Sequence, residues 1–230
     1  MKNKKTVYKI VVDVLMTIAL LLLMTYELIG SFPHEIIGTF MIVLFIIHHI
    51  LNRKWTADLF KRKYTLVRCF QTLLVVLVLV SILGSAVSGI ALSRHLYRFI
   101  PQFISASFAR KVHMICAYWG MLFMSLHPGF HWSMMLGMGK KLFKKPSKVR
   151  SISVRLSGFA LAGYGVYAFF KRKIADYLFL KIVFVFYDHK EPVIFFLLDY
   201  AAVMCTFVLI GYYLTIFLRK IGTKKNKADA

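Results

Sequence analysis

Four histidines recur at one spacing in two apolar stretches of this 230-residue chain. His34 and His48 are fourteen positions apart, and so are His113 and His127. Fourteen residues of α-helix rise about 21 Å and bring the second side chain back to within about 40° of the first. Imidazole is a metal ligand and a proton carrier, and inside membrane helices it is uncommon and a functional candidate. Each stretch therefore predicts two ligand positions near one helix face, one toward each membrane surface.

Helices long enough to cross a membrane must position these histidines. Hydrophobic residues make up 59% of the chain, and its mean hydropathy is +0.68. A soluble domain of this length could not bury so much apolar surface, which indicates an integral membrane protein built of helices. We expect one all-α domain over 1–230, a bundle of six transmembrane helices, with an extracytoplasmic amphipathic helix at 171–191 between the fifth and the sixth. The expected spans cover about 11–29, 34–51, 69–92, 110–136, 152–170 and 193–217.

The formal charge of +22 lies in short basic runs between the apolar stretches. That arrangement is typical of loops that face the cytoplasm and anionic head groups, so we expect membrane lipids, and no nucleic acid, as partners. With both termini inside, 22 of the 31 Lys and Arg residues fall on the cytoplasmic side. This bias predicts cytoplasmic N- and C-termini, with basic tails at 1–10 and 218–230. The three cysteines form no CxxC or CxxCH pattern, so zinc, iron–sulfur and covalent haem sites have no signal.

The two histidine pairs can face one another within the bundle. One complete span separates 34–51 from 110–136, so these helices run in the same direction. His34 and His113 then lie at a similar depth near the outer surface, and His48 and His127 near the inner surface. Each pair can hold a haem b between two imidazoles, which gives two haems per chain with centres about 20 Å apart. Two histidine ligands close both faces of the iron, which favours electron transfer over oxygen chemistry.

Two further histidines compete for the inner position. His49 follows His48 directly and faces about 100° away on a helix. His131 lies one turn beyond His127, and this breaks the match of spacing between the two stretches. Pro128 adds to the ambiguity because a proline can bend the helix at this point. The spacing favours His48 and His127 as ligands. His49 and His131 are the alternates.

Cations near the ends of the spans are candidate partners for haem propionates. Anchoring at lipid head groups is the simpler explanation for any one of them. Small residues at Gly38, at Gly120 and along 81–89 leave room for a porphyrin, although small-residue helix packing has the same signature. The candidate propionate partners are Arg94, Arg98, Arg110 and Lys111 for the outer haem, and Arg53 and Lys54 for the inner haem.

One acidic residue, Asp199, lies about two turns inside the last expected span. It could accept a proton from a quinol, or it could pair with a cation such as Lys173 or Lys181. We favour the ion pair. No glycine-rich nucleotide loop follows a strand pattern, so no flavin or nicotinamide domain is indicated.

The histidine-containing stretches resemble a known family. The segments from His34 to Gly38, from His48 to Trp55, from His113 to Trp132 and from Glu191 to Tyr200 are together similar to the flavinylation-associated cytochromes. These are small bacterial membrane proteins that were long classified as a domain of unknown function. The resemblance covers most of the chain. It implies a cytochrome b-like protein of the bacterial plasma membrane that passes electrons to a flavinylated extracytoplasmic protein.

The leading hypothesis is a six-helix electron conduit with two haems. Electrons would come from a quinol or a cytoplasmic donor and leave through the outer haem. Because no nucleotide domain is indicated, we expect an electron-transfer subunit rather than a self-sufficient oxidoreductase. The alternatives are a ferric-reductase-like membrane oxidoreductase and a transporter of metal or haem. Metal transport usually needs ligands clustered at one depth together with carboxylates, and the spans contain few of those.

Overall fold

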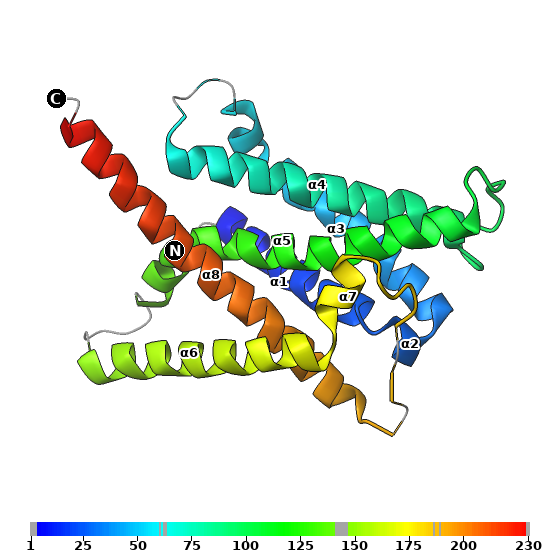
Figure 1. The fold of residues 1–230 in the computed structure, drawn as a ribbon. Coiled ribbons are helices and arrows are strands. Elements are labelled where there is room, and N and C mark those ends of the chain that lie inside the picture. Colours follow the sequence, from blue (N-terminus) through cyan, green and yellow to red (C-terminus); the bar gives the residue numbers. More distant parts are fainter. Residues whose placement is uncertain are drawn as a thin grey trace. The chain divides into compact units, whose positions relative to one another are not determined.

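The computed structural model describes residues 4–59, 61, 64–140, 147–185, 187–188 and 190–228. Within these residues the secondary structure is helical and no strand occurs, which confirms the expected all-α class. Figure 1 shows the helices in chain order, joined by turns and irregular segments. The helices are α1 (Lys4–Leu23), α2 (Tyr26–Ile29), α3 (Ser31–Ala57), α4 (Leu66–Leu92), α5 (Ala106–Lys140), α6 (Lys148–Lys171), α7 (Ile174–Leu178) and α8 (Val193–Ala228).

Five of the described helices are long and apolar enough to cross a membrane. They are α1, α3, α4, α6 and the part of α8 over Val193–Gly222. These helices indicate a multi-pass membrane protein. The 35-residue helix α5 has sufficient length, but it is not among the five. Its three histidines and its cations lower its mean hydropathy. The sixth span and the orientation of the bundle therefore stay predictions.

The expected amphipathic helix over 171–191 was wrong in extent. After Lys171, which ends α6, only the five-residue α7 is helical among the described residues of this stretch, and turns and irregular chain follow it. Lys173 and Leu180, which flank α7, both have φ of 51°, in the left-handed region that interrupts a right-handed helix. The backbone N–H of Lys181 then donates to the Asp176 carbonyl at 2.8 Å, so the chain turns back after α7.

The helices divide into two compact units. The first unit comprises Met1–Lys63, Val80–Tyr118 and Asp176–Leu197. Within it α1 packs along α3. Gly30 connects α2 to α3 with φ of 80°, a conformation that favours glycine. Pro33 follows in the first turn of α3, where its missing N–H would have no helical partner. Helix α3 therefore begins at Ser31, three residues before the start that was expected at His34.

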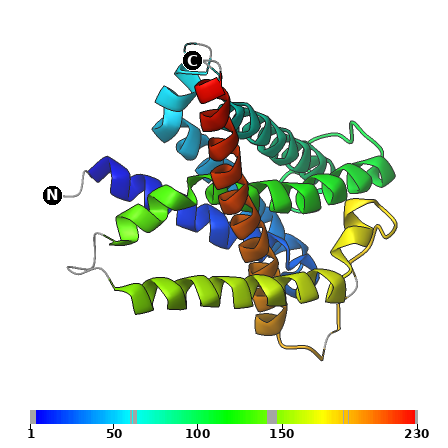
Figure 2. The same cartoon turned by 60° about the vertical axis from the view of Figure 1, so that its left-hand side comes forward.

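The second unit comprises Tyr64–Leu79, Trp119–Ala175 and Leu198–Ala230. Glycines allow the backbones of its helices to approach closely, as in many membrane bundles. Gly129 of α5 meets Gly211 of α8, where an added Cβ on Gly211 would lie 2.6 Å from the Leu126 carbonyl oxygen. Gly165 of α6 meets α8 in the same way, and Figure 2 shows these two helices crossing. Helix α5 continues without interruption through Pro128.

Replacing Gly165 with alanine should destabilise the second unit. The new Cβ would overlap the Ala202 carbonyl oxygen and the Thr206 hydroxyl, and a backbone carbonyl cannot move aside. Overpacking of this kind costs about 1–3 kcal/mol. Gly163→Ala in the same helix is the control, because a Cβ there meets no atom within 4 Å. Thermal unfolding in detergent should give a lower Tm for Gly165→Ala than for Gly163→Ala. Equal Tm values would contradict this packing.

Candidate functional site

The structure brings the predicted outer pair of histidines together in the first unit. The ring centroids of His34, on α3, and His113, on α5, lie 6.0 Å apart, and the ring planes are inclined at 66°. An imidazole nitrogen binds a metal at about 2 Å, so two rings on opposite sides of one metal have centroids roughly 6 Å apart. The separation of the two rings is therefore compatible with a shared metal, and it is also that of an edge-to-face ring contact.

Helix α4 fixes the orientation of the His113 ring. Nδ1 lies 3.1 Å from the Ser85 carbonyl oxygen and 3.2 Å from the Ser88 hydroxyl, which itself donates to the Gly84 carbonyl at 2.5 Å. A carbonyl only accepts hydrogen bonds, so Nδ1 carries the proton and Nε2 keeps a lone pair. Histidines that bind metals usually hold their second nitrogen in this way. His113 is therefore oriented as a ligand through Nε2.

Small residues on α4 make this contact possible. An added Cβ on Gly89 would lie 3.4 Å from Cε1 of His113, so a larger residue would press on the ring. The sequence suggested Ser85, Ser88 and Gly89 as small neighbours of a porphyrin. The structure gives the two serines a second role, because they supply the acceptors that orient the imidazole.

His34 is partly buried and differs from His113 in its hydrogen bonding. Its Nδ1 is buried and has no hydrogen-bond partner among the described residues. The Tyr26 ring meets it edge to face, with centroids 5.1 Å apart. A buried polar atom without a partner costs about 1–3 kcal/mol, which is more often tolerated at functional sites than elsewhere.

His48 and His49 both lie on α3 in the first unit, with different partners. His48 Nδ1 lies 2.7 Å from Oδ1 of Asp13 on α1. His49 Nδ1 lies 3.1 Å from the Phe45 carbonyl oxygen, one turn earlier on the same helix. Both acceptors place the proton on Nδ1 and leave Nε2 as a possible ligand atom. The sequence did not single out Asp13, although an acidic residue within an apolar helix is itself a signal.

His127 and its rival His131 lie on the part of α5 that belongs to the second unit. Their ring centroids are 5.2 Å apart. His131 Nε2 lies 2.9 Å from the Gln71 amide nitrogen, so this ring nitrogen already has a hydrogen-bond donor. That contact does not separate the two candidates, because an amide nitrogen, that of Asn52, also lies 3.4 Å from Nε2 of His48. His48 belongs to the first unit, and its pairing with His127 stays a prediction.

The predicted propionate partners have varied surroundings. Arg94, Arg98, Lys111, Arg53 and Lys54 are exposed side chains. The Arg110 guanidinium lies 4.7 Å from the centre of the Phe184 ring, a cation–π contact within the first unit. Their role as propionate partners stays a prediction.

Glu35 is an organising residue that the sequence analysis did not single out. Its carboxylate accepts hydrogen bonds from the Ser93 hydroxyl at 2.7 Å and from the backbone N–H groups of residues 94, 95 and 96 at 2.8–3.2 Å. The turn after α4 is thereby attached to α3, one residue from His34. Two further contacts join the same elements: Ser31 to His95 at 2.9 Å and Thr39 to Tyr97 at 2.9 Å.

Asp199 forms ion pairs, as the sequence favoured. Its partners are not the suggested Lys173 and Lys181. Its buried carboxylate accepts from Lys171 Nζ at 2.8 Å, from Arg172 at 2.7 and 2.8 Å, and from the Tyr164 hydroxyl at 2.5 Å. Lys181 instead lies 3.9 Å from Asp176. The partners of Asp199 come from the end of α6, because the glycine contacts of α6 with α8 bring that end close. This carboxylate is a structural anchor of the second unit.

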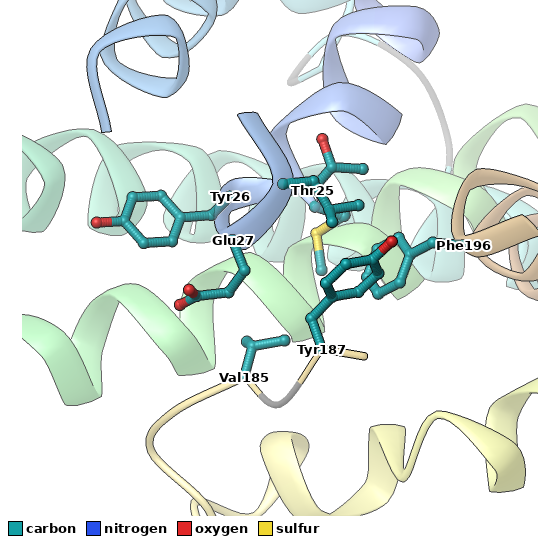
Figure 3. Close-up of a pocket in the computed structure, with 8 residues that line it drawn as sticks. Thr25, Tyr26, Glu27, Val185, Tyr187 and Phe196 are labelled. Atoms are coloured by element: carbon teal, nitrogen blue, oxygen red, sulfur yellow. The ribbon is translucent and has the colours of Figure 1, made fainter. Parts of the chain in front are cut away.

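A shallow pocket lies on the first unit near His34. Figure 3 shows Tyr26 and Glu27 on one side of it and Tyr187 and Phe196 on another. Its empty space is about 210 Å³ and includes open solvent. Because part of that space is open solvent, the enclosed cavity is smaller still and supports no ligand assignment.

In the part of the chain that the structure describes, no group of three or more His, Cys, Asp or Glu side chains could hold a metal ion. A haem iron needs only two protein ligands, because the porphyrin nitrogens supply the others. Comparison of the chain with protein-family models, curated proteins and solved structures found no match.

Replacing Glu35 with alanine should loosen the turn after α4. Hydrogen bonds to a charged group contribute about 1.5–3 kcal/mol each, so the amides of Arg94, His95 and Leu96 should exchange with solvent at least about ten-fold faster. Hydrogen–deuterium exchange with mass spectrometry would measure this. Glu27→Ala, which removes an exposed carboxylate of the same unit, is the control. Unchanged exchange in Glu35→Ala would show that the carboxylate does not hold the turn.

Proposed function

We propose that this chain carries electrons across a bacterial plasma membrane through two b-type haems. His34 and His113 hold the outer haem, and His48 and His127 hold the inner one. The observation that carries the proposal is the approach of the His34 and His113 rings to 6.0 Å, with the proton of His113 on Nδ1 and its lone pair on Nε2. When bound, a bis-histidine haem supplies reversible one-electron chemistry with both faces of the iron closed.

The residues around the outer position support a rigid ligand pair. Ser85 and Ser88 hold the His113 ring in one tautomer and one orientation. Glu35 ties the turn after α4 to the helix that carries His34. When two ligands are held in this way, their geometry changes little between two oxidation states of the metal. Such rigidity suits electron transfer.

The remaining parts of the proposal concern topology and partners. We take α5 as the sixth span, because a helix that carries cofactor ligands needs polar side chains where other spans are apolar. Both termini are cytoplasmic, following the distribution of Lys and Arg. A quinol or another membrane electron donor supplies electrons at the inner haem. A flavinylated extracytoplasmic protein accepts them at the outer haem, as the resemblance to the flavinylation-associated cytochromes implies.

Substitution of either outer ligand should remove one haem of two. We expect the purified protein, expressed with haem available, to show reduced-minus-oxidised bands of low-spin haem b and about two haems per chain. His34→Ala and His113→Ala should each retain about one, and added imidazole should restore part of the lost signal. His95→Ala is the control, because His95 is an exposed histidine that bonds to Ser31. Wild-type protein without haem, or two haems in both variants, would refute the proposal.

The inner ligands can be identified in the same way. His48→Leu and His127→Leu should each lower the haem content to about one per chain, while His49→Leu and His131→Leu should leave about two. Both expectations follow from the fourteen-residue spacing of His34 with His48 and of His113 with His127. Haem content by the pyridine haemochrome assay would decide. If His49→Leu lost a haem while His48→Leu kept both, His49 would be the ligand instead of His48. The same comparison between His131→Leu and His127→Leu would decide the other ligand.

A further inference from the structure

Asp13 is an acidic residue in the apolar helix α1 that the proposed function has not yet used. Its Oδ1 lies 2.7 Å from Nδ1 of His48, and the side chains are 53% and 25% exposed, respectively. A carboxylate within a membrane helix is costly and usually marks a function or a specific partner. Here the partner is one of the two histidines that compete for the inner position.

A chain of hydrogen bonds settles which nitrogen of His48 carries the proton. Lys9 Nζ donates to Asn52 Oδ1 at 2.7 Å, so the Asn52 amide nitrogen faces His48. That nitrogen donates to the His48 carbonyl at 2.9 Å and lies 3.4 Å from His48 Nε2. A carboxylate can accept only from a protonated Nδ1. The contacts on both ring nitrogens of His48 therefore agree: the proton lies on Nδ1 and the lone pair on Nε2.

The acceptor on His48 differs in kind from those on the other candidate ligands. His49 bonds to the Phe45 carbonyl, and His113 bonds to the Ser85 carbonyl and the Ser88 hydroxyl. Only His48, among these three, has a carboxylate as its acceptor. A hydrogen bond to an ionised acceptor is about twice as strong as one between neutral groups, and a carboxylate behind a metal-bound imidazole makes that imidazole a more basic ligand.

We propose that Asp13 is the positioning residue for the inner ligand, selecting His48 over His49 and giving the inner haem a lower reduction potential than the outer haem. A more basic imidazole stabilises the ferric over the ferrous state, so the haem is harder to reduce. Electron transfer from a haem held by His48 to one held by His34 and His113 would then run toward higher potential. This inference rests on the proposed function and adds a direction to it.

The test is a spectroelectrochemical titration of purified wild-type, Asp13→Asn and Asp13→Glu proteins with haem bound. In Asp13→Asn the lower of the two midpoint potentials should rise while the higher one stays unchanged. Asp13→Glu, which keeps the charge, should return the potential toward the wild-type value. Asp176→Asn is the control, because it removes a carboxylate of the same unit that pairs with Lys181.

Haem loss is a second informative result. Removing the carboxylate behind a ligand histidine can weaken metal binding by about 10–100-fold. If Asp13→Asn lost one haem, and this was the haem that His48→Leu loses, the result would support the proposal. Two haems with unchanged potentials and spectra in Asp13→Asn would overturn it and leave the proposed function standing. Retention of both haems in His48→Leu with loss of one in His49→Leu would overturn it as well. A wild-type protein that binds no haem would instead refute the proposed function.

Discussion

The apolar helices impose one constraint on this chain, which is that a polar side chain within them must find its partner in the protein, because lipid offers none. His113 meets this constraint through Ser85 and Ser88 on α4. His48 meets it through Asp13, and Asp199 through cations at the end of α6. These contacts join different helices across 25 to 35 residues of sequence. The residues that carry candidate chemistry are therefore also the residues that hold each unit together.

Periodic features of the sequence were sufficient to predict the helices and the outer pair. Long apolar runs predicted the five helices that are able to cross a membrane. Helices α4 and α6 lie within four residues of their expected bounds, but α1 covers Lys4–Leu23 instead of 11–29. The fourteen-residue spacing of histidines predicted that His34 would meet His113, and the two rings are in contact range.

Features that depend on tertiary contacts could not be predicted in this way. The partners of Asp199 follow from the close contact of Gly165 with Ala202, which no pattern in the sequence reveals. Glu35 had no predicted role, yet its carboxylate accepts hydrogen bonds from a turn about sixty residues away. The helix expected over 171–191 failed because Lys173 and Leu180 adopt left-handed backbone conformations, which propensity does not foresee in these residue types.

The central claim is that two histidines bind each iron on opposite faces. Electron paramagnetic resonance of the oxidised, purified protein tests it most directly, because the signal reports the axial ligands and the spin state together. We expect low-spin ferric signals from two bis-imidazole haems, unchanged when small external ligands such as azide are added. High-spin signals, or signals that external ligands convert, would show an open coordination position and contradict the closed electron conduit that His34 and His113 imply.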